Sequence, residues 1–114
     1  MVLINPGNPN IYQSHWKNRC RETVVTVASN GILNLPILGG SDNGEFAFLG
    51  YLQQEKIHYI SGSLENGDIL LEIQGQKVVG YTQRDVGAWL NHCCRNGNAV
   101  TLRVTDAGKV IQFV

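Results

Sequence analysis

Three runs of apolar and β-branched residues follow a polar first segment, at residues 22–27, 33–38 and 46–52. β-Branched and aromatic residues are favoured in strands, so each run predicts a strand. A turn at residues 28–31 and a polar loop at residues 39–45 separate them. We interpret the aromatic stripe on the third run as part of the core: Phe46, Phe48 and Tyr51.

The middle of the chain contains one strongly apolar run between turn signals. Residues 69–73 read Ile-Leu-Leu-Glu-Ile, which predicts a strand that is buried on both faces. Asn66-Gly67 before it favours a turn, because both residues tolerate positive φ. A short strand is predicted at residues 77–79. Residues 53–63 have the least regular pattern, and we expect a short helical turn there that contains Ile57, Tyr59 and Ile60.

The last part of the chain predicts a helix followed by a strand. Thr82 is a suitable N-cap, and Asp85 at the third helical position completes something close to a capping box, so the helix is expected over residues 83–93. Residues 99–104 alternate with the period of a strand. The order of elements predicts an α+β, mostly β domain: a small antiparallel sandwich or barrel with two helices.

The two ends differ from this central part. Residues 1–14 contain prolines, glycine and asparagines without an apolar period, which predicts a flexible lead-in. The domain is expected over residues 15–105, with His15 and Trp16 at its start. Residues 106–114 form a tail whose last five residues, Val-Ile-Gln-Phe-Val, are apolar enough to need a partner.

Composition excludes several classes of function. The chain has 114 residues and a formal net charge of +0, so it has no general attraction for nucleic acid or anionic lipid. No apolar run approaches the roughly 18 residues of a membrane span, so we expect no direct membrane insertion. Nor is there a hydrophobic stretch typical of a signal peptide, and the three cysteines are an odd number, so we expect an intracellular protein with reduced thiols.

The segment with His92, Cys93 and Cys94 has residue types of a nucleophilic or a metal site, but its spacing favours neither. His92, Cys93 and Cys94 are neighbours in sequence, so on a helix they face different ways, and no acid is spaced to orient the histidine. The same residues lack the four ligands of a usual metal site. We therefore expect no enzymatic activity, no metal and no cofactor.

Residues 31–40, Gly-Ile-Leu-Asn-Leu-Pro-Ile-Leu-Gly-Gly, contain a glycine-bounded loop that runs straight into a strand. Such a loop turns several main-chain N–H groups toward one point, which is a suitable site for a carboxylate. The pattern is also that of an ordinary hairpin turn, so by itself it decides nothing.

Residues 67–82 carry a more specific signal. They read Gly-Asp-Ile-Leu-Leu-Glu-Ile-Gln-Gly-Gln-Lys-Val-Val-Gly-Tyr-Thr, which closely resembles the G-D-x-I-L-x-V-N-G-x-x-V-x-G-x-T run of PDZ domains. The resemblance covers residues 22–105. A closer similarity is to the N-terminal PDZ domain of membrane-associated guanylate kinases with inverted domain order. It is carried by His15-Trp16, Arg19, Gly39-Gly40, Asn43 to Phe46, Phe48 to Gly50, Thr82, Arg84 to Val86, and His92-Cys93.

The resemblance implies a partly open antiparallel β-barrel of five to six strands, capped by two helices. It also implies a protein-interaction module that adds the C-terminal peptide of a partner as an extra strand between the second strand and the second helix. On the strand side, the implied peptide-binding residues are Ile32, Leu33, Asn34, Leu35, Pro36 and Ile37. On the helix they are Gln83, Gly87 and Leu90, which share one face at i, i+4 and i+7. Leu90 would form a pocket for an aliphatic terminal side chain with Leu33, Leu35 and Ile37.

Several residues depart from the family pattern or leave its consequence open. Asn34 replaces a glycine, but asparagine tolerates positive φ. Pro36 removes a possible hydrogen bond to the third strand, away from the ligand. The turn at residues 28–31 has no Lys or Arg near the carboxylate, so we expect weak binding. Gln83 replaces a histidine that selects Ser or Thr, which leaves selectivity open. Gly87 is either a tolerated substitution or a widening of the groove.

Two functions therefore remain. The first is a scaffolding module in the cytoplasm, at the plasma membrane or cell junctions, that binds the C-terminal tails of transmembrane or signalling proteins. The second is a degenerate PDZ domain that is structural or self-associating and captures no carboxylate. A weak self-association is also expected if Gln112, Phe113 and Val114 enter the groove of a second copy.

Overall fold

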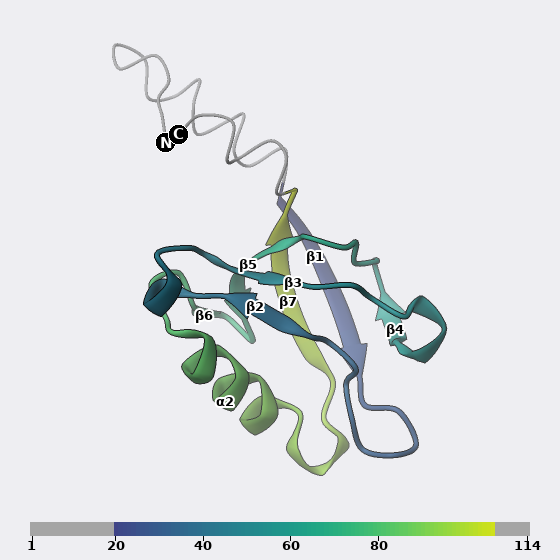
Figure 1. Cartoon of the computed structure of the whole chain (residues 1–114). Helices are drawn as coiled ribbons and strands as arrows, with labels where there is room; N and C mark the ends of the chain where they lie inside the picture. The colour runs from purple at the N-terminus through teal and green to yellow at the C-terminus, as the bar shows by residue number, and fades with distance from the viewer. Residues whose placement is uncertain (1–19, 107–114) are drawn as a thin grey trace.

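The computed structural model describes residues 20–106, and the predictions for residues 1–19 and 107–114 lie outside them. Its main feature is one antiparallel sheet in the order β2-β3-β5-β7-β1-β4, with β6 paired to β5 (Figure 1). The strands are β1 (Cys20–Thr26), β2 (Ile37–Gly39), β3 (Ala47–Leu49), β4 (His58–Ser61), β5 (Ile69–Ile73), β6 (Gln76–Lys77) and β7 (Val100–Thr105).

One α-helix, α2 (Gln83–Cys93), lies beside β2 at one edge of the sheet, and β4 forms the other edge (Figure 1). Three single 3-10 turns complete the described part: η1 (Ser41–Asn43), η2 (Gln54–Lys56) and η3 (Arg95–Gly97). The sheet does not close into a barrel, in agreement with the predicted partly open, mostly β architecture. The second predicted helix is absent from residues 20–106.

The prediction of a short helical turn that contains Ile57, Tyr59 and Ile60 is wrong. Only Gln54–Lys56 form a single turn, and Tyr59 and Ile60 belong to β4. β4 pairs with β1, with Tyr59 opposite Val25. The extended conformation of β4 depends on pairing with a strand more than 30 positions earlier in the chain, and the local sequence pattern does not reveal such a partner.

The second predicted strand is shorter than expected, because β2 begins only at Ile37. Asn34 has φ 64°, a left-handed conformation that interrupts an extended backbone. Pro36 has no N–H for the ladder with β3, although its carbonyl oxygen still accepts a hydrogen bond from Gly50 N–H at 2.9 Å. Residues 33–36 therefore follow the edge of the sheet as a loop.

The core lies between the sheet and α2. Its fully buried side chains include Leu49, Ile73, Val86, Val100 and Leu102. On the opposite face, Ile69 and Leu71 of β5 form a second small cluster with Cys20 and Phe48. β5 is thus buried on both faces, as predicted.

The aromatic stripe of the third predicted strand is not core as a whole. Tyr51 is 75% exposed and Phe46 is 39% exposed, while Phe48 is half-buried. β3 ends at Leu49, and the strand period stops there. Gly50 and Leu52 are buried, whereas Tyr51 between them is exposed. The side chain of Tyr51 therefore faces solvent.

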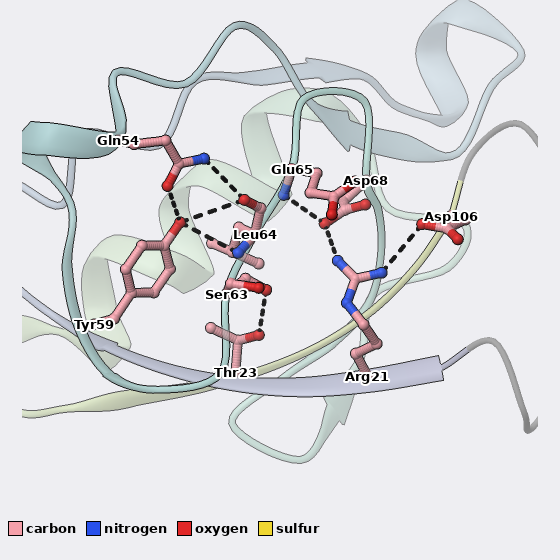
Figure 2. Close-up of polar contacts among 9 residues, drawn as sticks. All are labelled: Arg21, Thr23, Gln54, Tyr59, Ser63, Leu64, Glu65, Asp68 and Asp106. Carbon is pink, nitrogen blue, oxygen red and sulfur yellow. Dashed lines mark hydrogen bonds and ion pairs between the residues drawn. The ribbon is translucent and has the colours of Figure 1, made fainter.

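A polar network fixes the β4–β5 connection to β1 (Figure 2). Arg21 forms ion pairs with Asp68 and, at 3.1 Å, with Asp106. Asp68 is only 2% exposed and also accepts a hydrogen bond from Glu65 N–H at 2.8 Å. Burial raises the pKa of Asp68 above its ordinary value, against the opposing effect of those partners. Thr23 donates a further bond to the Ser63 carbonyl at 2.8 Å.

Candidate peptide-binding groove

The loop between β1 and β2 is built around Asn34. Its left-handed backbone, which the sequence predicted asparagine would tolerate, is stabilised by its own side chain. The Nδ2 group donates to the carbonyl oxygen of Lys56 at 2.9 Å and to that of Ile32 at 3.4 Å. The η2 turn therefore holds the loop in place from a segment 22 residues away.

Three consecutive main-chain N–H groups of this loop have no acceptor among the described residues. Within residues 20–106, the N–H groups of Leu33, Asn34 and Leu35 donate no hydrogen bond, whereas the N–H of Ile32 donates to Asn30 Oδ1 at 3.0 Å. Main-chain donors that find no acceptor in the protein are available to water or to an anion. A carboxylate needs such donors, because it accepts several hydrogen bonds at once.

The free edge of β2 lies next to these donors. Two main-chain groups near β2 form hydrogen bonds on the side of β3. The Pro36 oxygen accepts from Gly50 N–H, and the Gly40 N–H donates to Phe46 O at 3.3 Å. Main-chain groups alternate in direction along a strand, so those of Leu35 and Ile37 face away from β3. An extended peptide could pair with them along the gap between β2 and α2.

A first hollow of about 450 Å³ lies at the loop end of this gap. It is lined by six of the nine predicted binding residues, namely Ile32, Leu33, Asn34, Leu35, Pro36 and Leu90. Leu33 and Leu90 are buried, which gives the hollow an apolar floor. Tyr51, Gln53 and Asn91 also line it, and sequence reasoning did not propose any of them.

A second hollow of about 520 Å³ lies at the N-terminal end of α2. It contains the other three predicted residues, Ile37, Gln83 and Gly87. A Cβ atom added to Gly87 would meet no atom within 4 Å, so the glycine leaves open space on this side of the helix. Of the pocket expected around Leu90, Leu33 and Leu35 line the first hollow with it, and Ile37 lines the second.

The second hollow has a polar rim that the sequence prediction missed. Asp42, Asn43 and Arg84 line it together with Gln83. Asp42 and Asn43 stand in an Asp-Asn-Gly turn, a signal for a loop that does not say what the loop contacts. The groove therefore combines an apolar end beside Leu90 with a polar end beside Gln83.

The rejected chemical sites remain unsuited to catalysis. His92 stacks on Trp89, with ring centroids 5.4 Å apart, and burial raises the pKa of the Cys93 thiol above its ordinary value. A raised pKa disfavours the thiolate that a nucleophile needs. Among residues 20–106, no group of three or more His, Cys, Asp or Glu side chains is placed to hold a metal ion.

Comparisons with solved structures identify the fold. A PDZ domain from a choanoflagellate GIPC, solved with a GAIP peptide, superposes with a TM-score of 0.63 at 18% identity, over 76% of this chain and 89% of that one. The complex of the same domain with a B1AR peptide superposes with a TM-score of 0.57 at 20% identity, over 75% and 90%. The described domain has the fold of PDZ domains. No family model matches the sequence.

The sequence is also similar to part of a membrane-associated guanylate kinase. Membrane-associated guanylate kinase, WW and PDZ domain-containing protein 3 is 33% identical over 101 residues in Xenopus tropicalis and 35% identical over 107 residues in Rattus norvegicus. Each match covers 87% of this chain, but the chain spans only 9% and 7% of those relatives. The sequence is thus similar to one domain of much longer proteins. Within residues 20–106, no helix is long and apolar enough to cross a membrane.

Proposed function

We propose that this PDZ domain binds the free C-terminus of a partner protein as an added strand between β2 and α2. The observation that carries the proposal is the set of three N–H groups without an acceptor at Leu33, Asn34 and Leu35, at one end of an apolar hollow. The terminal carboxylate accepts from these groups, and the peptide main chain pairs with Leu35 and Ile37. The solved GIPC complexes support this mode, since both hold a peptide.

Side-chain selectivity follows from the two hollows. A terminal aliphatic side chain enters the first hollow and packs on Leu33 and Leu90, which are apolar and buried. Because side chains alternate along a strand, the residue two before the terminus also faces α2 and enters the second hollow. Gln83 can both donate and accept there, so it accommodates a polar side chain, and Gly87 leaves room for a large one.

The domain serves, in this proposal, as one anchoring point of a scaffold. The similar proteins are membrane-associated by name and contain WW and PDZ domains. The partners are accordingly the tails of transmembrane or signalling proteins, and the protein acts in the cytoplasm, peripherally at the plasma membrane or at cell junctions. The turn at residues 28–31 supplies no cation to the carboxylate, so individual contacts are weak and linked domains would strengthen them.

An array of C-terminal peptides tests this function. Decapeptides with random last six positions are synthesised once with free carboxylates and once as amides, and both arrays are probed with the domain. Selective retention on the free-acid array, with aliphatic residues enriched at the terminus, is the expected result. Equal retention on both arrays would refute carboxylate capture and favour the alternative of a structural or self-associating PDZ domain.

A further inference from the structure

We propose that Gln54 and Tyr59 are positioning residues for carboxylate capture, and that they act on the loop between β1 and β2 through the η2 turn. The proposal rests on the proposed function and adds residues outside the groove that fix the direction of its main-chain donors. Neither side chain lines the two hollows, so each reaches the ligand only through Asn34.

Asn34 depends on support from outside its own loop. Its backbone has φ 64°, a region that is unfavourable for an L-residue and persists only where the surrounding structure fixes it. Asn34 Nδ2 donates to the Lys56 carbonyl at 2.9 Å, whereas its bond within the loop, to Ile32 O, is 3.4 Å long. This backbone sets the direction of the three N–H donors of the loop, so their direction depends on where the Lys56 carbonyl lies.

The η2 turn, which carries this carbonyl, has no apolar anchor of its own. Residues 53–56 are all exposed, between the buried Leu52 and Ile57. Within residues 20–106, Gln54 has the one side chain of these exposed residues that forms a hydrogen bond. Apart from the bond that comes from Asn34, Gln54 therefore ties the turn itself to the rest of the domain.

Gln54, Tyr59 and Leu64 form a closed cycle of hydrogen bonds (Figure 2). Gln54 Nε2 donates to the Leu64 carbonyl at 2.8 Å, and Leu64 N–H donates to the Tyr59 hydroxyl at 3.2 Å. The hydroxyl in turn donates to Gln54 Oε1 at 2.6 Å. Leu64 is only 1% exposed, and Tyr59 packs on the core from its place opposite Val25. The cycle therefore connects η2 to the core of the domain.

Tyr59→Phe opens this cycle without changing a residue of the groove. Phenylalanine keeps an aromatic ring on the core, but it can neither accept from Leu64 N–H nor donate to Gln54. A binding site works only when its supporting residues hold it within about 0.5 Å of the productive geometry. We therefore expect the Lys56 carbonyl to shift and the three N–H donors to converge less well on a carboxylate.

Isothermal titration calorimetry on the intact chain tests this, with the best peptide of the free-acid array as the acid and as its C-terminal amide. In Tyr59→Phe, the ratio of the amide Kd to the acid Kd should fall about three- to fivefold below the wild-type ratio, as for the loss of about one hydrogen bond. Gln54→Ala opens the same cycle and should lower the ratio similarly. A merely structural role would reduce the folded fraction and weaken both peptides equally, so an unchanged ratio in both variants would overturn the proposal.

Tyr81→Phe is the matched control. Its hydroxyl accepts from Gln76 Nε2 at 3.1 Å, in the connection from β6 to α2, and has no bond to η2. The ratio in this variant should equal that of the wild type. A fall as large as in Tyr59→Phe would mean that any lost tyrosine hydroxyl has this effect, and would also overturn the proposal.

A double variant tests whether Tyr59 acts through Asn34. Glycine at position 34 adopts the left-handed backbone without strain but cannot donate to the Lys56 carbonyl. In Asn34→Gly, adding Tyr59→Phe should therefore lower the ratio no further, whereas two independent effects would add. A further fall would contradict the route through Lys56. Equal binding of the acid and the amide by the wild type would overturn the proposed function, and this inference with it.

Discussion

Gly87→Ala measures how much stability the glycine in the middle of α2 costs, separately from any effect of this glycine on peptide binding. Gly87 lies in the middle of α2 with no positive φ, and a Cβ atom added there meets nothing within 4 Å. Alanine therefore fits without strain and gains the helix propensity that glycine lacks, about 0.5–1 kcal/mol in the free energy of unfolding. For a domain of this size, that gain corresponds to a rise in Tm of roughly 3–8 °C.

Urea and thermal unfolding, followed by circular dichroism, measure this change. Ala88→Gly, at the next and exposed position of the same helix, is the matched control and should lose a similar amount of stability. A Gly87→Ala variant that is less stable than the wild type would refute the reasoning, because it would mean that the side chain meets an obstacle the structure does not contain.

Binding tests the other half of the argument. Gly87→Leu fills the second hollow, so peptides with a large residue two before the terminus should lose about tenfold in affinity, an amount typical of a displaced buried side chain. Peptides with alanine at that position should be little affected. Equal losses for both peptides would mean that glycine is merely tolerated here, which was the alternative left open by the sequence.

Three further experiments test other parts of the structure: substitutions of Asn34, a substitution of Arg21, and alkylation of Cys93. In a urea titration, Asn34→Ala should lower the free energy of unfolding by about 1–2 kcal/mol, because alanine cannot donate to Lys56 O and tolerates a left-handed backbone poorly. Asn34→Gly should lower it by less, because glycine adopts the left-handed backbone without strain. Arg21→Ala leaves the Asp68 carboxylate buried without its partner and should cost about 2 kcal/mol in urea unfolding, allowing for the 33% exposure of the arginine. Burial raises the pKa of the Cys93 thiol, so iodoacetamide at pH 7.5 should alkylate Cys93 more slowly than it alkylates free glutathione. Mass spectrometry measures both rates.

Each of these results has a clear opposite. Equal stability of the alanine and glycine variants at position 34 would remove the argument from backbone strain. Wild-type stability of Arg21→Ala would show that Asp68 finds sufficient partners without it. Faster modification of Cys93 than of glutathione would indicate an activated thiolate and reopen the rejected nucleophile.

Local signals were sufficient where an element is stabilised by its own neighbours. The bounds of α2 were predicted as residues 83–93, and Thr82 does accept the hydrogen bond of Asp85 N–H at 3.1 Å. The continuous apolar run of β5 likewise indicated burial on both faces. In these segments propensity, capping and tertiary packing favour the same conformation.

Sequence reasoning failed where contacts join distant residues. β4 was expected to be helical, because its pairing with β1 leaves no local signature. The hydrogen bond from Gln83 N–H to Asp42 Oδ1 was not anticipated, since the two residues are 41 positions apart. All nine predicted groove residues line the two hollows, but that placement came from family resemblance. Tyr51 and Asn43 were missed because they face the site from other segments, and Arg84 was missed because it is not one of the i, i+4 and i+7 positions of α2 that the prediction used.

Titration of one peptide in two forms tests the central proposal most directly. The best binder from the free-acid array is compared with the same peptide as its C-terminal amide, using isothermal titration calorimetry on the intact chain. If the N–H groups of Leu33, Asn34 and Leu35 hold the carboxylate, the amide should bind at least about tenfold more weakly, because hydrogen bonds to a charged group are lost. Equal affinities for the acid and the amide would contradict the account.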